Sequence, residues 1–188
     1  FSEIDIQNIK GDNNTSKLIF VNLEVNNLAT GSSDVIKLNK NIDVFQDLKF
    51  TSGNISLNGN NIFLEDLSSS SSNILNETND NRIFGFPGEV YLNRQFASGS
   101  LETNLSGIGL GIKFDGNLGT TKISRFNKHL INVSDTSFNR NHKIFPANGG
   151  NVSKLRFKYF DDDLIKSSTS SITENRLAIF YSIDESNY

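Results

Sequence analysis

A repeat of seven residues governs the middle of this 188-residue chain. Three triplets with apolar outer residues, at residues 48–50, 55–57 and 62–64, are separated by four-residue segments that contain Gly and Asn. The outer residues of each triplet share one face of an extended strand, because side chains alternate across a strand. Gly53 and Gly59 supply the backbone freedom that a tight turn needs. The pattern predicts short β-strands joined by turns and leaves little room for helices.

Two strand arrangements are compatible with this repeat. Three units occupy about 21 residues, which is close to one coil of a three-sided β-solenoid. An antiparallel meander would use the same units as successive hairpins. The period alone leaves both arrangements open.

The strand pattern also covers residues 17–26 near the N-terminus. There, one strand face is apolar throughout and the other consists of Leu18, Phe20, Asn22 and Glu24, a strict alternation that predicts a half-buried strand. The predicted apolar face consists of Ile19, Val21, Leu23 and Val25.

The C-terminal third predicts a different kind of sheet. Residues 153–159 alternate between apolar residues, predicted to point inward, and Lys or Arg, whereas residues 176–183 are apolar on both faces. With residues 122–133 they predict a small antiparallel sandwich. We therefore expect an all-β chain: a solenoid-like or meandering region of stacked short strands over residues 1–115, and the sandwich over residues 116–188, packed as one continuous unit.

Composition excludes several classes of function. Eighteen Lys and Arg against 21 Asp and Glu leave no positive field that would attract nucleic acid or an anionic membrane surface. The absence of Cys excludes a disulfide framework, a thiolate zinc site and a cysteine nucleophile. No apolar stretch approaches the roughly 18 residues of a membrane-spanning helix. Because Phe1 begins the chain in strand-like sequence and Met is absent, we expect a mature segment of a larger precursor.

The strongest acidic cluster is formed by Asp161, Asp162 and Asp163. Carboxylate oxygens are ligands that Ca²⁺ prefers, so these residues are the candidate cation site. Adjacent strand residues point to opposite faces, which favours the alternative of a solvated acidic turn that blunts a sheet edge.

No catalytic motif accompanies the possible acid–base residues. His129 and His142 are the only histidines, lie in polar sequence, and are expected in surface loops. A glycosidase-like carboxylate pair can be drawn among Glu89, Glu102 and Asp115, but sequence gives no separation between them. We expect neither catalysis nor a cofactor.

Glycine alternates with Ile and Leu at residues 107–112. A phosphate-binding loop would need a different spacing and a following helix. The alternation instead predicts a strand that lies close against another backbone.

Six short segments carry motifs whose order is more specific than any one of them. They are LKFTSGNISLNGNNIFL (48–64), NETNDNRIFG (76–85), NLGTTKISR (117–125), RNHKIFPAN (140–148), LRFKYFDDDL (155–164) and ENRLAIFYSIDES (174–186). In this order they resemble a module repeated in very large secreted surface proteins of Bacteroidota, including gliding and adhesion proteins exported by the type IX secretion system. The chain departs from the family pattern after Arg125, which lacks a following Gly-His, and at His142 and Phe145, which replace an aromatic residue and a Thr.

The resemblance implies an extracellular, β-rich module without known catalysis, followed by further modules or a sorting domain. Our expectation is a structural or adhesive role at the cell surface. Expected partners are neighbouring modules or copies of the chain, joined by strand addition at residues 1–9, with surface glycans as a further candidate. Two alternatives stay open: a carbohydrate-binding accessory module of a secreted hydrolase, and an enzyme built on a β-helix scaffold.

Overall fold

The computed structural model describes residues 8–9, 17–28, 35–64, 74–97, 104–127 and 140–160. This part of the chain contains β-strands and a 3-10 turn, with no α-helix, which confirms the all-β prediction. The elements are β1 (Asn8–Ile9), β2 (Lys17–Asn26), β3 (Val35–Leu38), β4 (Asn41–Ser52), β5 (Asn54–Ser56), β6 (Ile62–Leu64), β7 (Leu75–Asn76), β8 (Ile83–Phe84), β9 (Val90–Phe96), η2 (Leu105–Gly107), β10 (Leu110–Asp115), β11 (Gly119–Phe126), β12 (Asn141–Phe145) and β13 (Asn151–Phe157).

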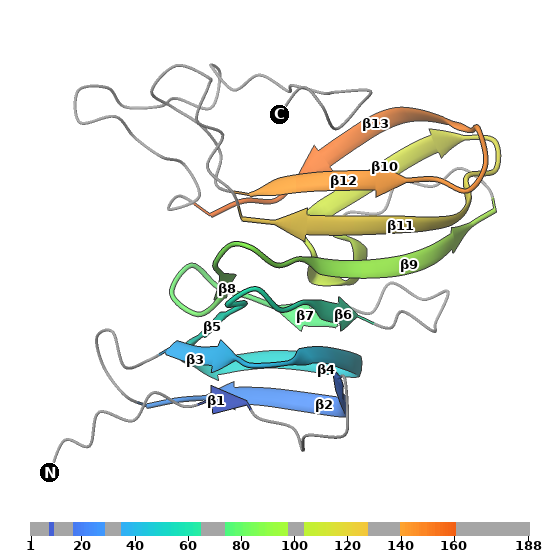
Figure 1. The fold of residues 1–188 in the computed structure, drawn as a ribbon. Helices are drawn as coiled ribbons and strands as arrows, with labels where there is room; N and C mark the ends of the chain where they lie inside the picture. The colour runs from blue at the N-terminus through green and yellow to red at the C-terminus, as the bar shows by residue number, and fades with distance from the viewer. Residues whose placement is uncertain are drawn as a thin grey trace, which may run out of the picture.

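The first nine strands form a parallel β-solenoid. Strands β1, β3, β5 and β8 stack in parallel as one side, and β2, β4, β6 and β9 stack in parallel as another. Figure 1 shows these coils piled along the molecule from the N-terminal end. The arrangement left open by the seven-residue repeat is therefore the solenoid and not the meander.

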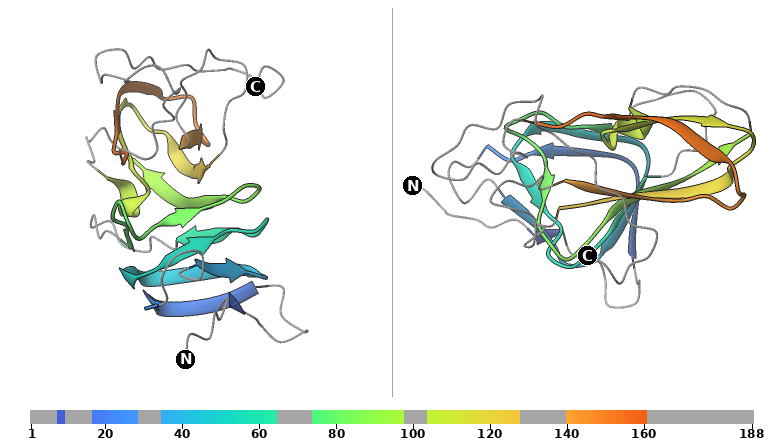
Figure 2. Two further views of the ribbon diagram at one scale, coloured as in Figure 1. Left: turned by 90° about the vertical axis from the view of Figure 1, so that its left-hand side faces the viewer. Right: turned by 90° about the horizontal axis from the view of Figure 1, so that it is seen from above.

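A third side arises because β4 bends around a corner. Its first half, at residues 42–44, pairs with β6, whereas residues 48–49 pair with β7. Strand β2 pairs along both halves of β4 and follows the same bend, which is visible in the view from above in Figure 2. The three predicted triplets lie in β4, β5 and β6, one on each side, so three units complete one coil.

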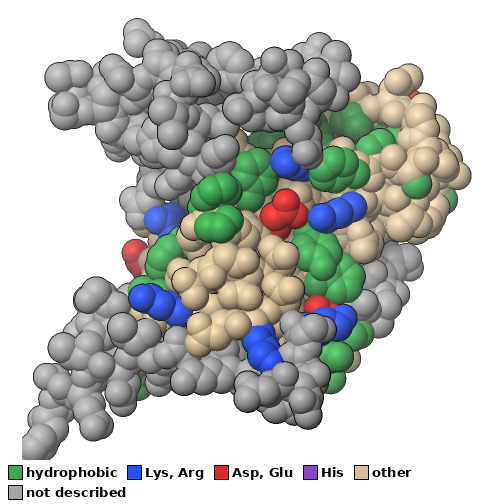
Figure 3. All heavy atoms as spheres, viewed as in Figure 1, with side chains coloured by type: hydrophobic (Ala, Val, Ile, Leu, Met, Phe, Trp, Pro, Cys, Tyr) green, Lys and Arg blue, Asp and Glu red, His purple; other side chains and the backbone are tan. Residues whose placement is uncertain are grey.

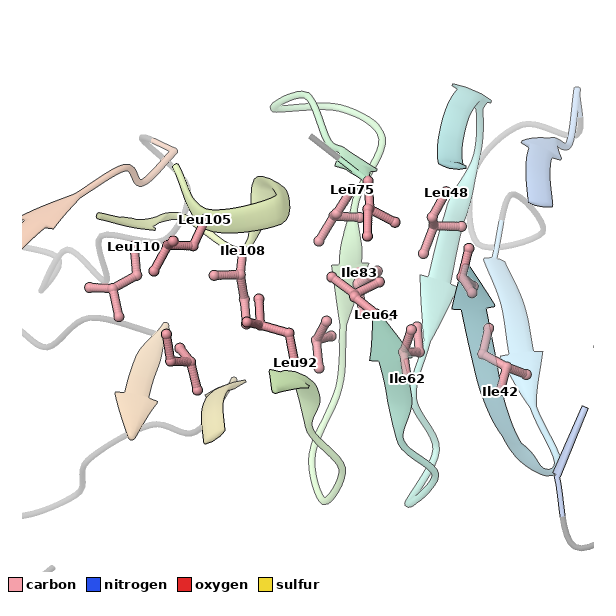
Figure 4. Packing of buried hydrophobic residues seen from close by; sticks show 14 of the residues in the cluster. Ile42, Leu48, Ile62, Leu64, Leu75, Ile83, Leu92, Leu105, Ile108 and Leu110 are labelled. Carbon is pink, nitrogen blue, oxygen red and sulfur yellow. The ribbon is translucent and has the colours of Figure 1, made fainter. Parts of the chain in front are cut away.

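Ladders of apolar side chains fill the interior. Ile42, Ile62 and Val90 occupy matching positions on successive coils, and each is at most 1% exposed. Leu48 and Leu75 form a similar pair on the third side. Figure 4 shows Ile42, Ile62, Leu48 and Leu75 among the side chains of one continuous core. Burying each such side chain contributes about 1.5–3 kcal/mol, so the stacked coils stabilise one another.

Asparagine side chains connect the coils at the corners. The backbone N–H of Asn61 donates to Oδ1 of Asn41 over 2.8 Å, and the N–H of Glu89 donates to Oδ1 of Asn61 over 2.9 Å. The N–H of Arg82 donates in the same way to Asn54 over 3.0 Å. Each bond satisfies a backbone donor that the turn leaves without a strand partner, which explains why a solenoid benefits from corner Asn residues.

An antiparallel cap closes the C-terminal end of the stack. Strand β9 pairs in parallel with β6 and antiparallel with β11, which pairs antiparallel with β12. The β10–β13 pair forms a second layer, joined by an edge-to-face contact between Phe96 and Phe114 with ring centroids 5.1 Å apart. The described part of the predicted sandwich is thus present, and residues 176–183 lie outside the described residues. One seven-stranded sheet crosses the predicted boundary at residue 115.

The predicted apolar face of β2 is wrong in its first half. Ile19 and Val21 are 62% and 55% exposed, whereas Leu18 and Phe20 pack against the core. The reason is the bend, which shifts the register between Phe20 and Asn22 and changes which alternate residues point inward.

A second correction concerns β13. Leu155 packs against the core as predicted, but Phe157 is 38% exposed. Strand β13 pairs with β10 at the margin of the cap, where the described layers leave its end less covered.

Candidate functional site

A buried ion pair joins the solenoid to its cap. Glu77 follows β7, and Arg125 lies on β11. Nη1 of Arg125 donates to Oε2 of Glu77 over 2.6 Å, and Nη2 donates to Oε1 over 2.9 Å. Both side chains are at most 2% exposed, so this two-pronged contact is shielded from water.

Two further groups complete the environment of Glu77. Nη2 of Arg140 lies 3.7 Å from Oε2, and the backbone N–H of Ile83 donates to Oε1 over 2.8 Å. The guanidinium of Arg140 also lies over the ring of Phe160, 4.8 Å from its centroid. The cluster therefore links β7, the turn before β8, β11 and the start of β12.

The carboxyl group of Glu77 is held in its charged form. Burial alone raises its pKa, but the attraction of Arg125 and Arg140 and the hydrogen bonds from Arg125 and Ile83 outweigh burial and lower the pKa below its usual range. Both carboxylate oxygens are occupied by donors. Glu77 is thus placed to hold the cap and not to exchange protons with a substrate.

His142 lies beside this cluster on β12 and not in a surface loop, which corrects the prediction for this residue. Its Nε2 contacts the carbonyl oxygen of Ile108 at 3.1 Å, which fits a neutral ring with the proton on Nε2, while Nδ1 is shielded from solvent. Burial, followed by repulsion from Arg125 and Arg140, lowers the pKa of His142 to about 3, although the Ile108 bond and Glu77 act the other way. His142 is neutral at ordinary pH.

A small polar cavity of about 50 Å³ adjoins the cluster. Its walls include Glu77, Asn104, Arg140, Lys158 and Phe160. This volume has room for a few ordered water molecules, whereas pockets for organic ligands measure about 300–1,000 Å³. The cavity suits hydration of buried charges better than substrate binding.

A strip of aromatic and charged side chains lies on the outer face of the seven-stranded sheet. The rings of Phe63 on β6 and Tyr91 on β9 are stacked, with centroids 5.0 Å apart. Nζ of Lys122 on β11 lies 4.7 Å from the centroid of Tyr91 and 3.3 Å from Oε2 of Glu89. Figure 3 shows hydrophobic side chains among basic and acidic ones on the face turned to the viewer.

One face of each of these rings is occupied by the other ring. Phe63 and Tyr91 are inclined to each other by 27°, so one face of each ring lies against the other. Lys122 approaches Tyr91 as a cation over an aromatic ring. A planar sugar-binding surface needs open ring faces, and this strip turns its rings toward its own members.

The structure separates the carboxylates considered for catalysis. Glu89 precedes the first residue of β9, whereas Asp115 ends β10, next to the turn that leads to β11 at the far end of β9. Glu102, His129 and the candidate calcium ligands Asp161, Asp162 and Asp163 lie outside the described residues. Across the ranges that are described, three or more His, Asp or Glu side chains do not gather as metal ligands would.

The glycine-rich segment makes the predicted close backbone contact. A Cβ atom on Gly107 would lie 1.8 Å from the carbonyl oxygen of Leu75, and one on Gly109 would lie 2.8 Å from that of Lys158. Residues 105–107 form the turn η2, and the strand begins only at Leu110. The close backbone contact is confirmed, although the first residues of the segment form a turn and not a strand.

The buried cluster was missed by the sequence predictions. One signal was present: Arg125 has the strand phase of Ile123, an apolar residue that is buried in the core. A charged residue at an inward position implies a buried partner. That partner, Glu77, is 48 residues away, which no local pattern identifies.

Comparison with known proteins gives no assignment. No family model, curated protein or solved structure matches the chain. A search of the described residues for a helix long and apolar enough to cross a membrane finds none.

Proposed function

We propose that this chain is a non-catalytic structural or adhesive module of a large secreted cell-surface or extracellular filament protein. The observation that best supports this role is the stack of parallel coils around one apolar core, closed at one end by an antiparallel cap. Such a scaffold presents long outer faces for contacts with neighbouring modules or surfaces.

We further propose that the chain is a type IX-secreted Bacteroidota module, on the resemblance of its six segments, and the buried cluster joins three of these segments. Glu77, Arg125 and Arg140 come from three of the six segments that carry the resemblance. These residues meet in one buried contact between solenoid and cap. A shared structural requirement for that contact would account for motifs in segments that are distant in the sequence.

A carbohydrate-binding accessory module is the second candidate. The partly exposed rings of Phe63 and Tyr91, next to Lys122 and Glu89, favour it. Because one face of each ring is occupied by the other ring, we expect binding to simple glycans to be weak and unchanged in Tyr91→Ala. Glycan-array binding that disappears in this variant would instead support the second candidate.

The structural role is tested in the organism that encodes the chain. An epitope inserted at exposed Gly149, in the turn between β12 and β13, should be detected by antibody on intact cells or in shed filaments, and external protease should remove it. Deleting the module should reduce attachment or cohesion. Retention of the epitope inside intact cells would overturn the proposal.

A further inference from the structure

The N-terminal end of the solenoid is open within the described ranges. Strand β2 is the last strand of the seven-stranded sheet, and no described strand pairs with its outer edge. Its inward residues Leu18, Phe20 and Leu23 pack against the core but are partly exposed. The residues that they stack on are 0% exposed: Ile42, Val44 and Leu48. The apolar core thus reaches the surface at this end.

The edge of β2 lacks the usual protection against strand pairing. Residues 18–23 contain no charge, Pro or Gly, and Ile19 and Val21 are more than half exposed. Other marginal strands carry cations, such as Lys143 on β12 and Lys154 on β13. An uncharged apolar edge of this length is a template for another strand.

We infer that the β2 edge binds a second copy of this chain in a two-fold symmetric dimer. The other end of the seven-stranded sheet is β12, which carries Lys143, and a charge on an edge strand opposes strand addition. The uncharged β2 edge is therefore the end through which two copies meet. A two-fold axis makes the paired strands antiparallel and closes the assembly at two subunits.

The bend in β2 fixes the register of this dimer. With the axis passing between Phe20 and Val21, at the corner, residues before the corner of one copy lie opposite residues after the corner of its partner. Leu18 then faces the partner's Leu23, and both point inward. Lys17 faces the partner's Glu24, and both point outward. Directly opposed residues in antiparallel strands share a face. Because the inward-pointing residues change phase between Phe20 and Asn22, inward residues before the corner can lie opposite inward residues after it.

Charge complementarity supports the same register. Lys17 contacts Asp43 within its own chain, and Glu24 contacts Lys49, yet the side chains of Lys17 and Glu24 remain 49% and 51% exposed. Lys17 of one copy can therefore also contact Glu24 of the other copy. The two-fold symmetry forms this contact twice. The two open cores meet between these charged ends. The inference rests on the proposed structural role and identifies a second copy of the chain as the binding partner.

Sedimentation equilibrium of the purified chain tests this inference. We expect a dimer, and a dissociation constant about ten-fold higher or more in Glu24→Lys, because two attractive contacts become repulsive. The matched control is Glu89→Lys, which also reverses a carboxylate paired with an exposed lysine, but lies away from β2. Circular dichroism should show the same folded spectrum for all three. A monomer, or an equal effect of both variants, would overturn the dimer.

Single-cysteine variants test the register, since the chain has no cysteine of its own. Val21→Cys should form a covalent dimer on mild oxidation, whereas Val152→Cys, which is 40% exposed on β13, should not. Equal cross-linking of both, or a series of higher oligomers, would contradict the two-fold arrangement. If the purified chain is a monomer but the epitope is detected on intact cells, the dimer is wrong and the proposed function is retained.

Discussion

At the scale of single residues, the most consequential group is the carboxylate of Glu77. It lies buried between the solenoid and the cap and accepts two bonds from Arg125 and one from the backbone of Ile83. A buried ion pair adds little net stability, because desolvation offsets attraction. Removing one partner is different, since it leaves a buried charge without compensation.

Arg125→Met should therefore destabilise the chain by about 3–5 kcal/mol, which denaturant unfolding measures. The control is Lys122→Met on the same strand, which removes an exposed pair with Glu89 and should cost about 1 kcal/mol or less. Similar losses in the two variants would show that the Glu77 contact is not the anchor of the cap.

His142 makes stability depend on pH. Its pKa is about 3 in the folded chain against 6.5 as the ordinary value, so between these values the unfolded chain binds a proton that the folded chain does not. This contribution is complete above pH 6.5 and declines as the pH falls, by at most about 1.4 kcal/mol per pH unit. Glu77, whose pKa is lowered, loses its own contribution only as the pH falls below its ordinary 4.5.

Between pH 6.5 and 4.5 the contribution of His142 therefore changes before that of Glu77. His142→Gln should flatten the fall of unfolding free energy over this interval, as urea titrations at a series of pH values will reveal. An unchanged slope in the variant would mean that His142 is not a shielded neutral ring in solution.

At the scale of elements, short strands and their corners were predictable, whereas their partners were not. The triplets in β4, β5 and β6 followed from period two and from glycine turns. Parallel pairing joins residues 19 to 29 positions apart, so a local pattern cannot distinguish it from hairpins. The apolar face of β2 was mispredicted because strict alternation carries no sign of a corner at Val21.

The turn η2 illustrates how a glycine sets the distance between elements. Gly107 and Gly116 both have positive φ, 83° and 84°, but only Gly107 has a crowded Cβ position, 1.8 Å from Leu75 O. Gly116→Ala should cost about 1–2 kcal/mol from backbone conformation alone. Gly107→Ala should cost a further 1–3 kcal/mol or more, because η2 must move away from β7. Thermal unfolding of the two variants compares these costs, and equal melting temperatures would contradict the tight contact.

At the scale of the whole molecule, one end of the solenoid is closed and the other is open within the described residues. The cap turns a parallel stack into antiparallel pairing at β9, while β2 leaves its outer edge and part of the core exposed. This asymmetry favours assembly through the β2 end, because the cap already closes the other end. Strand addition at residues 1–9 stays a prediction, because residues 1–7 lie outside the described residues.

The central claim is that successive coils stack in parallel, and backbone NMR tests it most directly. We expect cross-strand contacts linking Ile42 to Ile62 and Ile62 to Val90, with neighbouring residues following in the same order. A spectrum that instead links residues 55–57 to residues 62–64 in reversed order, as hairpins require, would contradict the solenoid.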